Sequence, residues 1–432
     1  MLIRILYYYY RTIFLKNHLN SMEKLNSYQK SQFKTLVKKE LHQSPFYKEY
    51  LGKPFHEWPI MNKNLMMDHF DEINTQKIKK ADALNNALKA EETRDFSPLI
   101  NNISVGLSSG TSGTRGLFLA SPRERDAWAG IMLAKLLPDG FKKNERIALF
   151  LRANNRLYTE LNKSRKIAFH FFDLIANFDE HIENLNVVQP TIISAPSSVL
   201  LLLAQERHRL TVRPKKIVAV AEVLEAEDEA IISKAFNLPV SQIYQCTEGF
   251  LAISDKKSNT LVMNDEFVII EKEWLDENRF IPIVTDLVRT TQPIIRYRLD
   301  DVLVAKKSAG VFTELTSIEG RLGDVLYGQK GCDVIPIFAD TIRQVIASCP
   351  VEFEEYQIQQ IKLNEVTIQV YPDLENKALL TSYLNQIFEQ KGCQIPKWIW
   401  QEYERKEISS KRRRIQSKLT TLPNMSDNRG DK

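Results

Sequence analysis

The stretch GLSSGTSGTRG, residues 106–116, concentrates small and hydroxyl-bearing residues in a chain that otherwise contains little glycine. It holds four of the 15 glycines in 432 residues. Strand-like runs flank it, ISVGL at 103–107 and GLFLAS at 116–121. The stretch is therefore predicted to be a turn that joins two strands. It lacks the Gly-Lys-Ser/Thr ending of the nucleotide P-loop.

The composition of this turn favours binding of an anion. Glycines let backbone N–H groups point at one spot without a Cβ in the way. Arg115 adds positive charge. Hydroxyl donors come from Ser108, Ser109, Thr111, Ser112 and Thr114. A phosphate cradle is one interpretation, and a surface hairpin without a ligand is the other.

Downstream of the turn, short apolar runs alternate with helical patterns. Strands are predicted at 146–151, 190–196, 215–222 and 241–245, and helices at 197–208, with a serine cap, and at 225–236. This alternation predicts an α/β fold with mainly parallel sheets flanked by helices. Ligands of such sheets lie beyond the carboxyl ends of the strands. Glu222 and the segment 243–249 follow two of these strands and become site candidates.

A second glycine-rich stretch, EGRLGDVLYGQKG at 319–331, precedes a smaller α/β pattern. We place a domain boundary there. The prediction is a large N-terminal domain, residues 1–320, and a small, mobile C-terminal lid domain, residues 321–432. Two domains also suit the length, because single cores stop growing beyond about 250–300 residues.

Charge and cysteine content bear on whether the chain binds nucleic acid, holds a zinc cluster or relies on disulfides. The chain has 59 basic and 54 acidic residues, a net charge of +5, which does not argue for nucleic acid as a partner. Its four cysteines form no CxxC pair, so neither a zinc cluster nor a disulfide framework is indicated. These features predict a cytoplasmic protein.

The N-terminal sequence MLIRILYYYYRTIFLKN is apolar but interrupted by Arg4 and Arg11. Its uncharged runs are too short for a membrane span or a signal-peptide core, so no integral membrane segment is predicted. An amphipathic helix packed on the protein is the main expectation. Peripheral contact with a membrane is the alternative.

The turn at 106–116 resembles the phosphate loop of the adenylate-forming superfamily, which includes acyl-CoA synthetases and the adenylation domains of peptide synthetases. Further stretches resemble motifs of that family in the same order: IYQCTEG (243–249), PIIRYRLDD (293–301), GRLGD (320–324) and SSKRRRI (409–415). The stretches SPFYKEY (44–50), WPIMNKNLM (58–66) and VAE (220–222) resemble the branch of phenylacetate–CoA ligases and coenzyme F-type, deazaflavin-adenylylating synthetases.

The resemblance implies roles for individual residues. The phosphates of ATP would be held by the turn, at Ser108, Ser109, Gly110, Thr111, Ser112, Gly113 and Thr114. Tyr244 and Glu222 would line the adenine site. Thr247 would face the α-phosphate, and Glu248 would hold Mg²⁺. Taken alone, Glu222 could equally cap a helix.

The C-terminal motifs complete the implied site. Asp301 would accept the ribose hydroxyls, with Arg321 near the ribose. Gly323 would be the pivot of the hinge. Lys411 would be the catalytic lysine, although its setting in KRRR is also typical of a solvated basic tail.

The implied activity is ATP-dependent conversion of a carboxylic acid, aromatic or otherwise hydrophobic, to an acyl-adenylate. The acyl group would then pass to a thiol of CoA or of an acyl or aryl carrier protein. An adenylyltransferase that leaves AMP on a small-molecule acceptor is one alternative. A non-enzymatic basic binding protein, based on residues 405–418, is another. A degenerate ligase is a third, because Gln245, Leu299 and Asp300 depart from the family motifs.

Overall fold

The computed structural model describes residues 1–108, 115–151, 167–174, 176–307, 310–321, 324–404 and 413–419. These residues belong to two compact units. Unit 1 contains Met1–Leu299 and Val304–Ser317, and unit 2 contains Asp300–Leu303 and Ile318–Lys432. Each unit is described by itself.

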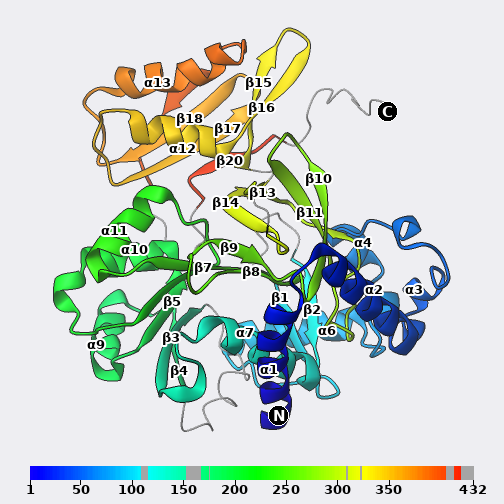
Figure 1. The fold of residues 1–432 in the computed structure, drawn as a ribbon. Coiled ribbons are helices and arrows are strands. Elements are labelled where there is room, and N and C mark those ends of the chain that lie inside the picture. Colours follow the sequence, from blue (N-terminus) through cyan, green and yellow to red (C-terminus); the bar gives the residue numbers. More distant parts are fainter. Residues whose placement is uncertain are drawn as a thin grey trace. The chain divides into compact units, whose positions relative to one another are not determined.

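The parallel part of the large sheet occupies one side of unit 1 (Figure 1). Its strands run in the order β4 (Ile167–Asp173), β3 (Glu145–Leu151), β5 (Ile192–Pro196), β6 (Lys216–Val220) and β7 (Val240–Cys246). The connecting helices are α9 (Phe178–Val188), α10 (Ser197–Gln205) and α11 (Ala226–Phe236). Every residue of β5 is buried, as expected for a parallel strand covered on both faces. The predicted α/β class is confirmed.

Beyond β7 the same sheet continues with strands that pair mostly antiparallel. They are β8 (Gly249–Ser254), β9 (Leu261–Met263), β14 (Glu314–Arg321), β13 (Asp301–Ala305), β11 (Arg279–Asp286) and β10 (Val268–Trp274), with β12 (Tyr297–Arg298) paired to β11. The pairs β7–β8, β8–β9 and β10–β11 are antiparallel. The large sheet is therefore mixed, and the change from parallel to antiparallel pairing falls at the hairpin that contains Thr247 and Glu248.

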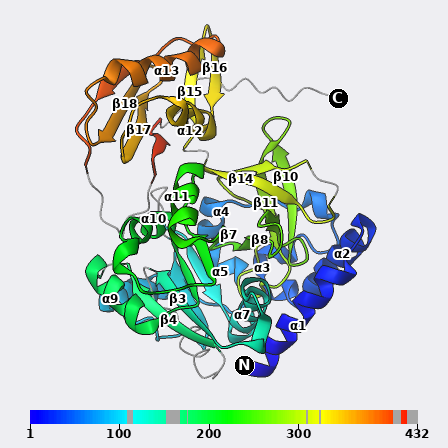
Figure 2. The same ribbon diagram turned by 60° about the vertical axis from the view of Figure 1, so that its left-hand side comes forward.

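Helices dominate the N-terminal part of unit 1. They are α1 (Leu2–His18), α2 (Met22–Lys39), α3 (Pro45–Lys48), α4 (Lys63–Asp68), α5 (Phe70–Ile73) and α6 (Lys80–Thr93), with 3₁₀ turns at Leu41–Gln43 and Phe55–Glu57. Two further 3₁₀ turns lie at Gly140–Lys142 and Arg207–Arg209. Helix α1 lies along α7 (Pro122–Leu136), as Figures 1 and 2 agree. The approach is close because a Cβ on Gly130 would lie 2.5 Å from the carbonyl oxygen of Ile5.

Unit 2 contains a sheet in the order β19 (Lys397–Trp400), β18 (Glu365–Tyr371), β17 (Glu355–Lys362) and β20 (Ile415–Ser417). It also has the hairpin β15 (Leu326–Lys330) and β16 (Asp333–Ile337), and the helices α12 (Ala339–Ser348) and α13 (Lys377–Gln390). Ile342 of α12 and Leu384 of α13 share one buried cluster with Ile358 and Ile368 of the sheet. Unit 2 therefore has a hydrophobic core of its own.

Candidate active site

The glycine-rich turn lies between β1 (Ser104–Leu107) and β2 (Leu117–Ala120), which pair antiparallel. The prediction that the turn joins two strands is confirmed. Ser108 closes its base: its N–H donates to the Gly116 carbonyl at 2.8 Å, and its Oγ accepts from the Gly116 N–H at 2.8 Å. The other candidates in the turn, Ser109, Gly110, Thr111, Ser112, Gly113 and Thr114, lie outside the described residues.

Two residues of the turn have functions different from those we expected. Gly106 lies under the ring of Phe118 across the hairpin, and a Cβ there would lie 2.2 Å from the ring and force it to move. Arg115 does not offer an unpaired charge to a ligand. Its guanidinium donates to both carboxylate oxygens of Glu91 in α6, at 2.6 and 2.5 Å, and to the Ser108 carbonyl at 2.9 Å. Arg115 therefore fixes one arm of the hairpin.

Glu222 follows β6 and caps a helix. Its Oε2 accepts from the Ser198 N–H at 3.0 Å and from the Ser197 hydroxyl at 3.3 Å. The prediction that a serine caps α10 is therefore wrong. Pro196 is the N-cap residue, and the carboxylate of Glu222, just beyond β6, accepts the hydrogen bond from the first turn of the helix. Ala221 before it has a φ of +66°, a conformation uncommon for residues with a Cβ. This bend turns the main chain at the carboxyl end of the strand.

Tyr244, Thr247 and Glu248 lie at and just beyond the carboxyl end of β7. The Tyr244 side chain is buried, and Thr247 and Glu248 are half-buried. The Thr247 hydroxyl donates to Oε2 of Glu248 at 2.8 Å. Within the part of the chain that the structure describes, no cation pairs with the Glu248 carboxylate. A half-exposed acid of this kind can bind a cation from solution.

Arg289 connects this hairpin to β2 and was not identified from the sequence. Its guanidinium donates to the Thr247 carbonyl and, at 3.1 Å, to the Leu119 carbonyl. The side chain of Asp286 shapes the loop that carries Arg289, because its Oδ1 accepts from the N–H groups of Val288 and Arg289 at 2.7 and 2.9 Å. Burial raises the pKa of Asp286, although the nearby Arg289 opposes this. The strand leaving the glycine turn is thus fixed to the Thr247–Glu248 segment.

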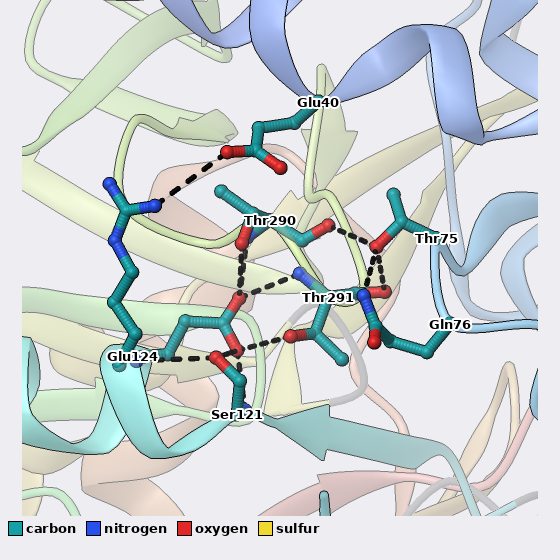
Figure 3. Close-up of polar contacts among 8 residues, drawn as sticks. Glu40, Thr75, Gln76, Ser121, Glu124, Thr290 and Thr291 are labelled. Carbon is teal, nitrogen blue, oxygen red and sulfur yellow. Dashed lines mark hydrogen bonds and ion pairs between the residues drawn. The ribbon is translucent and has the colours of Figure 1, made fainter. Parts of the chain in front are cut away.

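Glu124 holds the same loop from the other side (Figure 3). Its carboxylate accepts from the N–H groups of Ser121 and Thr291 at 2.6 and 2.7 Å, and also from the N–H of Thr290. The hydroxyls of Ser121 and Thr291 donate to it at 2.7 and 2.6 Å. Burial alone would raise the pKa of Glu124, but these hydrogen bonds outweigh it and keep the pKa below 4.5. The Ser-x-x-Glu spacing at 121–124 is the sequence signature of a capping box and could have signalled this residue.

Two stretches singled out in the sequence meet in unit 1. The N–H of Met61, within 58–66, donates to the Arg296 carbonyl at 2.8 Å. The N–H of Arg298 donates to the Met61 carbonyl at 2.9 Å. The Arg296 guanidinium pairs with Glu271 at 2.9 Å. The segment before Leu299 is thereby anchored to the N-terminal helical region.

In unit 2 the structure brings together Asp301 and Arg321, with 3.7 Å between Oδ1 and Nε. They lie on the adjacent strands β13 and β14. Gly320 has a φ of +123°, and a Cβ there would lie 2.6 Å from Oδ2 of Asp324. That same oxygen accepts from the Arg321 N–H at 2.7 Å. The chain entering the GRLGD stretch therefore needs glycine at position 320.

The C-terminal basic stretch is anchored where it is described. Arg413 donates through Nε to Oδ1 of Asp324 at 2.9 Å. Arg414 is buried, 3.6 Å from the carboxylate of Glu355, and Ile415 begins β20. Residues 413–415 are therefore not a solvated tail. Lys411 and Gly323 lie outside the described residues.

The fold defined by these elements is that of the adenylate-forming ligases. A crystal structure of 2-hydroxyisobutyryl-CoA ligase, in the postadenylation state with R3-HIB-AMP, is similar to it with a TM-score of 0.67 and 14% identity, over 93% of this chain and 91% of that one. The amide bond synthetase McbA of Marinactinospora thermotolerans has a TM-score of 0.53 and 12% identity, over 70% and 66% of the two chains. ATP-bound MatB of Rhodopseudomonas palustris has a TM-score of 0.52 and 13% identity, over 72% and 65%.

The sequence comparisons are more limited. Protein CapK of Staphylococcus aureus is 28% identical over 163 residues, a segment that spans 36% of this chain and 36% of CapK. No protein-family model matches the chain. Among the described helices, none is long and apolar enough to span a bilayer.

Proposed function

We propose that this protein activates a carboxylic acid with ATP, forming an acyl-adenylate and pyrophosphate. The observation that carries the proposal is the Arg289 bridge, because it fixes the Thr247–Glu248 hairpin to the strand that leaves the glycine turn. In this arrangement two segments with expected phosphate contacts share one rigid support. The similarity of the fold to that of ligases solved with acyl-AMP and with ATP supports the same activity.

In the first step, a carboxylate oxygen of the acid attacks the α-phosphorus of ATP, and the bond to the pyrophosphate oxygen breaks. Negative charge on the phosphate oxygens must be stabilised by positioned donors. The N–H groups and hydroxyls of residues 108–114 would bind the β- and γ-phosphates. The Thr247 hydroxyl would donate to the α-phosphate in place of its bond to Glu248, and the Lys411 ammonium would neutralise charge on the same group.

Mg²⁺ fits the donors that this chain offers. In nucleotide sites, this ion is typically held by one or two carboxylates together with phosphate oxygens and water. Glu248 supplies one half-exposed carboxylate, and no group of three or more possible ligands occurs among the described residues. When bound, Mg²⁺ would offset the charge of the phosphates.

We assign the ribose hydroxyls to Asp301, with Arg321 beside it, and the adenine to Tyr244 and the main chain at Glu222. The acid is proposed to be aromatic or otherwise hydrophobic. In a second step, a thiol sulfur of CoA or of a carrier protein would attack the acyl carbon, and AMP would leave. The small unit would act as a mobile lid.

A pyrophosphate-exchange screen over aryl, cinnamyl and fatty acids tests the proposal. The expected result is exchange into ATP that requires one class of acid. The best acid is then incubated with CoA or a carrier protein, and the products are identified. A thioester supports the acid–thiol ligase. AMP left on an acceptor supports the adenylyltransferase instead, and no exchange with any acid contradicts the proposed activation of a carboxylic acid.

A further inference from the structure

Helix α1 has two apolar faces, and only one of them is covered by the protein. The inner face packs on α7 through buried residues: Ile5, Tyr8, Tyr9, Thr12 and Leu15. Gly130 of α7 admits the helix backbone at close range, and the Tyr9 ring lies 4.5 Å from that of Phe141. The helix is therefore firmly anchored, and its outer face has a fixed direction on unit 1 (Figures 1 and 2).

The outer face of α1 carries large apolar side chains exposed to solvent. Ile3 is 84% exposed, Tyr7 59%, Tyr10 62% and Phe14 60%, at the spacing of one side of a helix. Leu2 and Ile13 extend this face. At about 100° per residue the six side chains cover an arc of about 140°. They form a patch on the order of 800 Å², above the few hundred Å² usual for a monomer, which marks an interaction site.

Basic side chains border this apolar arc on both sides. Arg4 and Arg11 lie along one edge and Lys16 along the other, and the first acidic residue of the chain is Glu23. Arg4 pairs with Asp126 at 2.7 Å, and Lys16 pairs with Asp255 at 2.5 Å. Arg11 donates to the neutral groups of Tyr28 and Gln32, so these contacts leave its charge uncompensated. The helix itself contains no carboxylate that would repel an anionic surface.

We propose that the outer face of α1 docks onto the surface of an anionic lipid bilayer. Aromatic rings favour the level of the lipid headgroups, and arginine and lysine beside an apolar face are attracted to anionic lipids. A second copy of this chain fits the outer face of α1 less well than a lipid surface does. Two-fold pairing of the helix, parallel or antiparallel, would bring one basic border against another. The apolar arc would thus lie in the headgroup region while the inner face stays on α7.

Vesicle flotation of the full chain tests this proposal. The vesicles are phosphatidylcholine alone or phosphatidylcholine with one-third phosphatidylglycerol. The wild-type protein is expected to float with the anionic vesicles, and less so at high salt. The double variant Ile3→Ser/Phe14→Ser keeps the net charge and is expected to lower the partition coefficient by at least about tenfold. Val187→Ser, at a residue of α9 that is 81% exposed, is the matched control and should float like wild type.

Three results would overturn the proposal. One is wild-type protein that stays with the lipid-free fractions, and another is a double variant that floats as well as wild type. The third is a wild-type dimer in vesicle-free buffer that the double variant dissociates, since the occupant is then a second copy. Thermal unfolding checks that the variants fold, and Tyr10→Ser provides a second, independent substitution on the same face.

Discussion

Replacing Glu124 by glutamine should destabilise unit 1 strongly although the side chain keeps its shape. Every described partner of the carboxylate is a donor, comprising three backbone N–H groups and hydroxyls of serine and threonine. Glutamine has one acceptor oxygen, so its NH₂ group must face donors. The least costly orientation puts the NH₂ group against Ser121, in the place of Oε2. There the hydroxyls of Ser121 and Thr291 can rotate to accept from it, but the Ser121 N–H stays unpaired.

One unpaired buried N–H costs about 1–3 kcal/mol, and the remaining two N–H bonds lose about 1 kcal/mol in total when their acceptor becomes neutral. We therefore expect Glu124→Gln to lower the free energy of unfolding by about 3 kcal/mol at pH 7. Urea unfolding monitored by tryptophan fluorescence measures this. Glu273→Gln is the control, because its pair with Arg298 is half-exposed at the surface, where such a pair contributes about 0–1 kcal/mol.

The pH dependence of the same variant provides a second test. The pKa of Glu124 is lowered in the folded state, so the stabilisation by its charge is complete above 4.5 and is lost as the pH falls through the folded pKa. The difference between wild type and variant should therefore shrink below pH 4.5. A variant as stable as wild type at pH 7, or a deficit that does not change in acid, would refute the assignment.

Three further perturbations test separate parts of the structure. Arg289→Lys leaves one ammonium to reach the carbonyls of both Thr247 and Leu119. The Thr247–Glu248 hairpin would then be mispositioned, so pyrophosphate exchange should slow by about 10²-fold, with kcat affected more than KM. Exchange at the wild-type rate would contradict the role of the Arg289 bridge. Gly320→Ala should cost at least about 2 kcal/mol in urea unfolding, because φ is +123° and Asp324 obstructs the Cβ, whereas Gly331→Ala, with positive φ but open space, should cost less. Burial raises the pKa of Asp265 to about 6, so its charge destabilises the fold above that pH. Asp265→Asn should therefore gain up to about 3 kcal/mol at pH 7.5 and nothing below pH 3.8, and a constant difference across the titration would exclude this cause.

The sequence was sufficient to predict four of the five parallel strands, because apolar runs such as 146–151 and 190–196 alternate with helical patterns. The edge strand β4 was not predicted. The strands β8 to β14 were not predicted individually. Some pair with the next strand of the chain, as β10 does with β11, but β14 pairs with β9 through Glu314 and Val262, which are far apart in the sequence. Gly106 was counted as part of the glycine-rich turn, but it lies within β1, where its missing side chain leaves room for the Phe118 ring across the hairpin.

The supporting residues of the candidate site were also missed. Arg289 contacts Leu119 across 170 positions, and Glu124 contacts Thr290 across 166. No local pattern reveals such partners. Only the capping box at 121–124 was visible in advance, and it predicts the start of a helix rather than a buried carboxylate that holds a distant loop.

The most direct test of the account is acid-dependent exchange of pyrophosphate into ATP by wild type and by Lys411→Ala. With the best acid of the screen, wild type should exchange, and the variant should lose at least about 10²-fold of that rate while still binding ATP, because a charge that stabilises the transition state is removed. Equal exchange by the two proteins would contradict the role of Lys411, and no exchange by wild type with any acid would contradict the proposed activity itself.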